Sequence, residues 1–264
     1  MQFPARWLII RFMSEIKAIV FDLGETLINY GPVSVNSVFH QGARLSYAYI
    51  QNELSESAKR SNFWAYFLKH FFLIRSHVVK AALSQREFDC AALLEKQLRT
   101  MGLSASAGQL EELCWRWYAP LAATATIEAD LHSTLQRLQD RSLKFAILSN
   151  TFLPGSVLDR HLKQWDLLRF FPLRFYTSET IIRKPDKRIY ELVLDKLNVT
   201  ATNAIMVGDH LRNDIFGAEK AGLQAVFKRG QGNQTKQVPS RIAVINRIAE
   251  LPTLLDRQRE ETHV

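Results

Sequence analysis

Residues 16–26 read IKAIVFDLGET, and this stretch decides the fold class of the chain. The first six residues form a short apolar run rich in β-branched side chains, which is typical of a buried strand. The run stops at Asp22, and a loop that contains Gly24 and Thr26 follows it. We therefore predict a buried strand whose carboxyl end opens into a loop with charged and hydroxyl groups.

The second half of the chain alternates between strand and helix patterns. Helices are expected at 128–141, 155–165, 186–197 and 213–221, and strands at 143–148, 170–177, 203–207 and 223–228. Strands that alternate with helices of this length indicate parallel βαβ units. Together with the first strand, they predict an α/β fold with a Rossmann-like core built on a parallel sheet.

The region between the first strand and this alternating half has a different pattern. Apolar residues recur at helical spacing in four stretches, 35–54, 62–80, 84–100 and 106–118, with almost no glycine. This pattern predicts a four-helix cap at 31–124. The cap would be inserted into a discontinuous core formed by residues 14–30 and 125–250.

The ends of the chain and one late loop lie outside this scheme. Residues 1–13 are interpreted as an N-terminal extension, because a second methionine stands just before the first strand. Residues 251–264 are expected to form a C-terminal tail. The polar, glycine-containing run 230–237 is expected to be a flexible surface loop.

The composition limits the class of protein. The chain has 264 residues, of which 47% are hydrophobic, so it can bury a sizeable core. Its formal net charge of +8 suggests an anionic partner. Two cysteines, Cys90 and Cys114, are too few for a disulfide framework and are read as small buried residues. With no long apolar run and no nucleic-acid motif, we expect a cytoplasmic protein without membrane or nucleic-acid partners.

Polar residues follow four apolar runs, where an open parallel sheet binds its ligands. These positions are Asp22 to Thr26, Ser149 with Asn150, Lys184, and Gly208-Asp209 with Asp214. A carboxylate can attack phosphorus, while a divalent cation offsets its repulsion from an anionic substrate. Asp22 and Asp209 could share one Mg²⁺, which prefers oxygen ligands. Lys184 and Ser149 would hold the oxygens of a phosphate group.

The order and spacing of these motifs resemble the haloacid dehalogenase superfamily of hydrolases, in the branch with a helical cap after the first motif. This resemblance implies that Asp22 is a nucleophile that forms an aspartyl-phosphate. It implies that Asp209 and the backbone carbonyl of Gly24 bind Mg²⁺ with Asp22, and that Thr26 and Asp214 support the site. Asn150 is assigned to phosphate binding with Ser149 and Lys184. The expected function is a Mg²⁺-dependent phosphatase that acts on a small phosphorylated metabolite.

One position departs from the family pattern. The phosphatases of this family have a second aspartate, which protonates the leaving group, where this chain has Gly24. General acid–base catalysis is worth about 10²- to 10⁴-fold in rate. Glu25 could act as a displaced acid, or a cap residue such as His40 could supply the proton. Alternatively, the substrate has a good leaving group, such as an acyl or aryl phosphate.

The missing aspartate also leaves other functions open. Dehalogenases of the superfamily lack it too, because halide leaves without a proton, so a 2-haloacid dehalogenase is an alternative. A phosphonate hydrolase is another, and it would need a lysine in the cap, for which Lys59, Lys69 and Lys80 are candidates. The last alternative is a catalytically impaired binding protein on the same fold.

Overall fold

The computed structural model describes residues 15–54, 62–230 and 232–262. The expected N-terminal extension and Lys59 lie outside the described residues. Six parallel strands form one sheet in the order β3-β2-β1-β4-β5-β6. The strands are β1 (Ala18–Phe21), β2 (Lys144–Ser149), β3 (Leu173–Tyr176), β4 (Ala204–Gly208), β5 (Gln224–Lys228) and β6 (Ala243–Ile245). The predicted α/β fold with a parallel sheet is thus confirmed, and β6 is an additional strand that is too short to show a pattern in the sequence.

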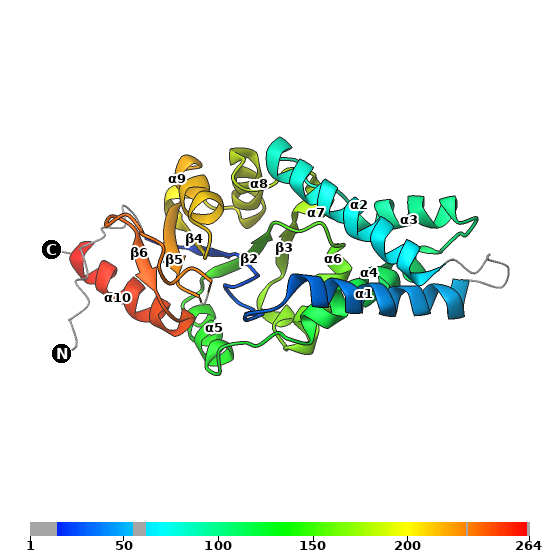
Figure 1. Cartoon of the computed structure of the whole chain (residues 1–264). Coiled ribbons are helices and arrows are strands. Elements are labelled where there is room, and N and C mark those ends of the chain that lie inside the picture. Colours follow the sequence, from blue (N-terminus) through cyan, green and yellow to red (C-terminus); the bar gives the residue numbers. More distant parts are fainter. Residues whose placement is uncertain (1–14, 55–61, 231, 263–264) are drawn as a thin grey trace.

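Helices cover both faces of the sheet (Figure 1). Ile19 and Phe21 of β1 face a core with helices α5 (Leu131–Gln139), α6 (Gly155–Gln164) and α10 (Leu251–Thr262). Ala18 and Val20 face the opposite core, which is closed by α8 (Lys187–Leu197) and α9 (Gly217–Lys220). Shorter helical segments lie at Leu168–Phe170, Thr177–Thr180 (α7), Ala201–Asn203, Leu211–Phe216 and Ile248–Glu250.

The C-terminal segment differs from the tail that the sequence suggested. Helix α10 extends to Thr262 and packs Leu251 and Leu255 against the first core. Its Asp256 pairs with Arg141, with 2.7 Å between Oδ1 and Nη1. Burial of the two leucines therefore orders a segment whose own sequence is strongly polar.

The helical insertion between β1 and β2 is also confirmed. It contains α1 (Val35–Tyr49) with a following π-helical turn (Ile50–Leu54), α2 (Phe63–Ser84), α3 (Cys90–Thr100) and α4 (Ala107–Ala122). We call these four helices the cap, and they lie on the side of the molecule away from α10 (Figure 1). Helix α3 begins later than the pattern suggested, because the Asp89 carboxylate accepts hydrogen bonds from the amides of Ala91 and Ala92.

Close packing joins the cap helices to one another. Gly42 of α1 touches the backbone of α4, where an added Cβ would lie 2.5 Å from the carbonyl oxygen of Trp117. Tyr66 of α2 is 4% exposed and stacks on the Trp117 ring. Cys90 and Cys114 are buried free thiols, as expected. Within the described residues, no helix is both long and apolar enough to cross a membrane.

The connection between α2 and α3 ties the cap to the core. Arg86 and Ile182 form an antiparallel bridge, and the Glu87 amide donates to the Ile181 carbonyl at 2.9 Å. The Thr177 hydroxyl donates to the Glu87 carboxylate at 3.0 Å. These contacts lie next to Lys184, so they place the cap directly over the carboxyl ends of the strands.

Candidate active site

Three carboxylates meet where β1 and β4 end. Asp22 follows β1 and Asp209 follows β4, and the amide of Asp22 donates to the Val207 carbonyl at 2.9 Å. Candidate ligand oxygens of Asp22, Asp209 and Asp214 all lie within 4.8 Å of one another. The sheet order reverses direction between β1 and β4, which is where sheets of this kind bind ligands.

Lys184 lies between two of these carboxylates. Its side chain is 2% exposed, and Nζ donates to Asp22 Oδ1 and Asp214 Oδ1, both at 2.7 Å. The third donor position is taken by the carbonyl of Leu148 at 2.8 Å. Burial opposes the charge of this ammonium group, but the two carboxylates outweigh burial and raise the pKa of Lys184. Lys184 therefore stays charged and holds the two aspartates in place.

Burial changes the pKa values of Asp22 and Asp209. Burial raises the pKa of Asp22 to about 6, against the lowering effect of Lys184. Burial and the neighbouring charges of Asp22 and Asp214 raise the pKa of Asp209 to about 7. Thr26 Oγ1 donates to Asp22 Oδ2 at 3.3 Å, whereas the Asp209 carboxylate has no hydrogen bond with the described part of the chain.

This donor set fits a hard divalent cation. Three carboxylates face one ammonium group, so the cluster has an excess of negative charge that a cation would balance. The Gly24 carbonyl accepts no hydrogen bond from the residues that the structure describes, so it could act as a third ligand. Asp22, Asp209 and the Gly24 carbonyl are therefore the groups that could hold the ion.

Asp214 serves as an anchor for the other groups. Its Oδ1 accepts from Lys184, and its Oδ2 accepts from the His210 amide at 2.9 Å. A Cβ added at Gly208 would lie 2.4 Å from Asp214 Cγ, so the glycine makes room for this side chain. Both oxygens of Asp214 are thus occupied in positioning Lys184 and the loop after β4.

Ser149 and Asn150 follow β2, as predicted, but differ in what they contact. Ser149 is 7% exposed and lines the cavity above Asp22. The Asn150 amide group donates to the Lys184 carbonyl and accepts from the Lys184 amide, each at 2.9 Å. Asn150 therefore fixes the backbone of Lys184 through one amide N–H and its amide oxygen.

Asn233 is a site residue that sequence reasoning missed. Its side chain is buried, and Nδ2 donates to the carbonyls of Asp209 at 3.0 Å and Lys228 at 3.1 Å. The loop after β5 is thus attached to the loop after β4 at this residue. Lys228 is 3% exposed, and its ammonium group pairs with the Glu128 carboxylate at 3.0 Å.

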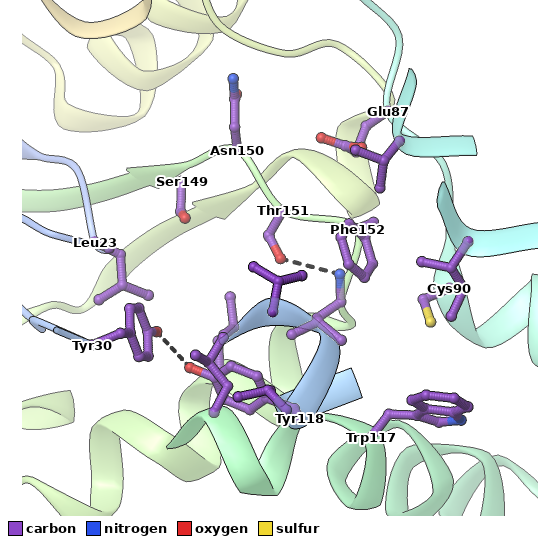
Figure 2. A pocket seen from close by; sticks show the side chains of 18 of the residues that line it. Leu23, Tyr30, Glu87, Cys90, Trp117, Tyr118, Ser149, Asn150, Thr151 and Phe152 are labelled. Carbon is purple, nitrogen blue, oxygen red and sulfur yellow. Dashed lines mark hydrogen bonds between the residues drawn. The ribbon is translucent and has the colours of Figure 1, made fainter. Parts of the chain in front are cut away.

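A cavity of about 530 Å³ lies between the cap and the core, and we call it the main cavity (Figure 2). Asp22, Gly24 and Ser149 form part of its core side. Its cap side is formed mainly by aliphatic and aromatic residues, among them Val38, Phe39, Ile74, Val78, Trp117 and Leu121, and it also includes Glu87, Cys90 and Tyr118. A substrate whose phosphate reaches Asp22 would therefore place its remaining part against the cap.

The candidates for a displaced acid or a Schiff-base lysine that the structure describes do not line the main cavity. The Glu25 carboxylate accepts from the Tyr30 amide at 3.1 Å and is not part of the cavity wall. His40 packs against aromatic rings of the cap, including Phe63 and Trp64. Lys69 donates to Thr100, and Lys80 lines a separate, smaller cavity.

The chain belongs to the family of haloacid dehalogenase-like hydrolases. The model of that family matches residues 16–222, which include all four motifs and four of the six strands. The protein is accordingly a hydrolase, and the resemblance inferred from the motifs is confirmed.

Three relatives that are similar in sequence are phosphatases. The phosphoglycolate phosphatase of Pectobacterium atrosepticum is 26% identical over 172 residues, which are 62% of this chain and 71% of that protein. The ribulose-1,5-bisphosphate 5-phosphatase of Halopiger xanaduensis is 32% identical over 42% of this chain and 45% of its own. The glyceraldehyde 3-phosphate phosphatase of Pyrococcus furiosus is 32% identical over 40% of this chain and 49% of its own. The chain thus spans about half the length of the latter two.

Solved structures share the fold over almost the whole chain. The 2-haloacid dehalogenase from Pseudomonas syringae pv. Tomato DC3000 has a TM-score of 0.63 at 21% identity, and covers 92% of this chain and 99% of its own. The HAD phosphatase from Thermococcus onnurineus has a TM-score of 0.59 at 21% identity, with 91% and 98% covered. At these identities the likeness extends to the fold, and the reaction has to be argued from the site.

Proposed function

We propose that this protein is a Mg²⁺-dependent phosphatase that acts on a small phosphorylated metabolite through a covalent intermediate on Asp22. The observation that carries the proposal is the cluster of Asp22, Asp209 and Asp214 around Lys184, with candidate ligand oxygens within 4.8 Å. The phosphatase relatives, which match part of the chain, support it.

The proposed reaction consists of two successive displacements at phosphorus. A carboxylate oxygen of Asp22 bonds to phosphorus as the bond from phosphorus to the leaving-group oxygen breaks. Water then attacks phosphorus, which releases inorganic phosphate and restores the Asp22 carboxylate. Lys184 holds Asp22 in place through Oδ1, and Ser149 lies at the adjacent strand end to receive phosphate oxygens.

Mg²⁺ bound by Asp22, Asp209 and the Gly24 carbonyl would reduce the repulsion between the nucleophile and the anionic phosphate. Glycine at position 24 leaves the site without the carboxylic acid that protonates an alkoxide in the family. We expect the rate to depend steeply on the acidity of the leaving group for this reason.

The Asp22→Asn variant tests the proposal. It should abolish the Mg²⁺-dependent hydrolysis of 4-nitrophenyl phosphate, because an amide is a poor nucleophile. The Asp195→Asn variant, which changes an exposed aspartate of α8, is the matched control and should retain full activity. Undiminished hydrolysis by Asp22→Asn would refute the assignment of the nucleophile.

A second candidate function is 2-haloacid dehalogenation, which Gly24 favours because halide needs no proton donor. Release of chloride from a 2-haloacid without added metal would support it over the phosphatase. Phosphonate hydrolysis has less support, since neither Lys69 nor Lys80 lines the main cavity. The remaining alternative, an impaired binding protein, predicts metal binding without any of these activities.

A further inference from the structure

The cap wall of the main cavity contains no charged group that is free to meet a charged substrate. Within the described part of the chain, the charged residues that line the cavity are Asp22, Glu87 and Arg183. Arg183 Nη1 lies 3.7 Å from Glu87 Oε2, and the Glu87 side chain is 3% exposed. The positive charge of Arg183 is thus already balanced by a buried carboxylate.

A substrate with a second anionic group would be poorly accommodated in this cavity. Its carboxylate would lie among valine, isoleucine and tryptophan side chains, where the charges in the lining are Asp22 and the Arg183–Glu87 pair. Burial of a charge without a partner is strongly unfavourable.

We infer that the leaving group is a neutral, apolar ring, so that the natural substrate class is aryl phosphates. The inference rests on the phosphatase activity proposed above and names its substrate class. Gly24 supports it independently, because a phenolate leaves without the protonation that an alkoxide needs. The apolar wall and the missing acid thus favour the same chemistry, one through binding and the other through reactivity.

Four substrates separate this inference from the proposed function. We expect kcat/KM for phenyl phosphate to exceed that for 4-carboxyphenyl phosphate and for phosphoglycolate by about tenfold or more, because only the last two would bury a carboxylate. Leaving-group acidity alone would favour the carboxyphenyl ester, so the order of the two aryl esters is diagnostic. Acetyl phosphate needs neither the apolar wall nor an acid and reports on Asp22 alone.

A pair of neighbouring valines on α2 provides a matched test. Val78 lines the main cavity and is 42% exposed, whereas Val79 does not line it and is 59% exposed. Val78→Arg should lower kcat/KM for phenyl phosphate and raise it for 4-carboxyphenyl phosphate, while Val79→Arg changes neither. If acetyl phosphate is hydrolysed but the carboxylated esters are preferred, the substrate class is wrong. If neither acetyl phosphate nor any of the other esters is hydrolysed, the proposed function itself fails.

A separate observation concerns a chain of hydrogen bonds that ends at Tyr30. The Trp165 indole donates to His161 Nε2 at 3.2 Å, and His161 Nδ1 lies 2.8 Å from the Tyr118 hydroxyl. The hydroxyls of Tyr118 and Tyr30 are 2.6 Å apart (Figure 2). Both tyrosines line the main cavity with Asp22 and Gly24.

The donor and acceptor properties of these groups fix the direction in which each hydrogen bond of the series is donated. An indole nitrogen can only donate, so His161 Nε2 accepts and the ring proton lies on Nδ1. Burial lowers the pKa of His161 to about 4, so the ring is neutral and donates to Tyr118. Tyr118 is 5% exposed, and its own proton is satisfied only if it donates to Tyr30. The hydroxyl proton of Tyr30 is then left to face the cavity.

The geometry points to Tyr30 as the hydrogen-bond donor to the leaving-group oxygen, with Tyr118 and His161 as positioning residues. A Cβ added at Gly24 would lie 3.5 Å from Tyr30 Cε2, so the ring borders the space of the absent acidic side chain. A hydrogen bond from this hydroxyl would stabilise the negative charge that develops on a phenolic oxygen.

The Tyr30→Phe variant tests this role. It should lower kcat/KM by about tenfold for phenols of low acidity. The loss should shrink for nitrophenols and vanish for acetyl phosphate, so the dependence on leaving-group acidity becomes steeper. Tyr49→Phe, which removes a hydroxyl outside the main cavity, should leave this dependence unchanged. An equal loss for every substrate, or no loss, would overturn the assignment.

Discussion

The carboxyl edge of the sheet and the cap wall face each other across one cavity, but they are built from opposite kinds of side chains. The edge gathers Asp22, Asp209, Asp214 and Lys184 within hydrogen-bonding or ligand distance. The wall across from it is aliphatic and aromatic. In the proposed function, the charged edge carries out the reaction at phosphorus, and the wall selects what is attached to the phosphate. That proposal predicts that chemistry and specificity can be altered separately.

The largest expected effect comes from removing a ligand at the charged edge. Asp209→Asn should lower the Mg²⁺-dependent turnover of phenyl phosphate by about 10²- to 10³-fold, because the variant loses electrostatic stabilisation of the transferred group. KM for the ester should change far less, since the cap wall is untouched. Titration of activity with Mg²⁺ measures both effects, and retention of the parental Mg²⁺ dependence would show that Asp209 is not a ligand.

The next effect is on stability. Lys184→Met leaves the buried carboxylates of Asp22 and Asp214 without their counter-charge, so the free energy of unfolding should fall by about 3–5 kcal/mol. Lys187→Met breaks an ion pair with Glu191 whose side chains are 58% and 49% exposed, and should cost about 0.5 kcal/mol or less. Urea denaturation compares the two. Equal losses would mean that the buried lysine does not balance the edge.

A smaller effect is expected from restoring an acid. Position 24 has no left-handed backbone conformation, and an added Cβ makes only an ordinary contact with Tyr30, so aspartate can be accommodated there. Gly24→Asp should raise kcat/KM for alkyl phosphates by about 10²-fold while changing that for nitrophenyl phosphate little. An equal gain for both classes would contradict the view that an acid is missing.

The smallest effect is a dependence of stability on pH in the absence of metal. In the folded protein the pKa values of Asp22 and Asp209 are raised to about 6 and about 7, from 3.8. Between these limits the two carboxylates bind more protons in the folded state than in the unfolded state, so their contribution to the free energy of unfolding should fall as pH rises from 5 to 8. The buried rings of His70 and His161, whose pKa values are lowered to about 4, contribute a slope of the opposite sign, so thermal unfolding in EDTA is compared between the parent and Asp209→Asn.

Asp209→Asn supplies the control for that slope. Replacing the unpaired carboxylate should flatten the pH dependence and raise Tm at pH 8 without metal. Mg²⁺ should raise Tm of the parent protein more at pH 8 than at pH 5, because the ligands must ionise to bind it. A parent slope that is no more negative than that of Asp209→Asn would contradict the raised pKa of Asp209.

The two regions also differ in how far the sequence foretells them. Asp22, Ser149 and Asp209 each follow an apolar strand, so the parallel sheet alone brings them to one edge. Asn233 lies in a polar loop, and its burial depends on a contact with Asp209 that no local pattern records. Glu87 is similar, because it becomes part of the cavity only when the cap docks on Thr177.

Helical periodicity likewise predicts only part of the structure of the cap. It finds the helices around Val38, Ile74 and Trp117, but it does not say which apolar residues fill the cap core and which line a cavity. The hydrogen bonds from Tyr30 to Trp165 join residues from three segments and are visible only in three dimensions. The residues that line the cavity are therefore visible only in the structure, whereas the positions of the charged residues follow from the ends of the strands.

The central claim is that phosphoryl transfer occurs at Asp22, and a rapid acid quench tests it most directly. Phenyl phosphate and Mg²⁺ are mixed with excess enzyme, quenched within the first turnover and digested for mass spectrometry. The account predicts a phosphorylated peptide that contains Asp22, which is absent from the Asp22→Asn variant. Phosphate release without that peptide, or with a phosphoryl group on another residue, would contradict it.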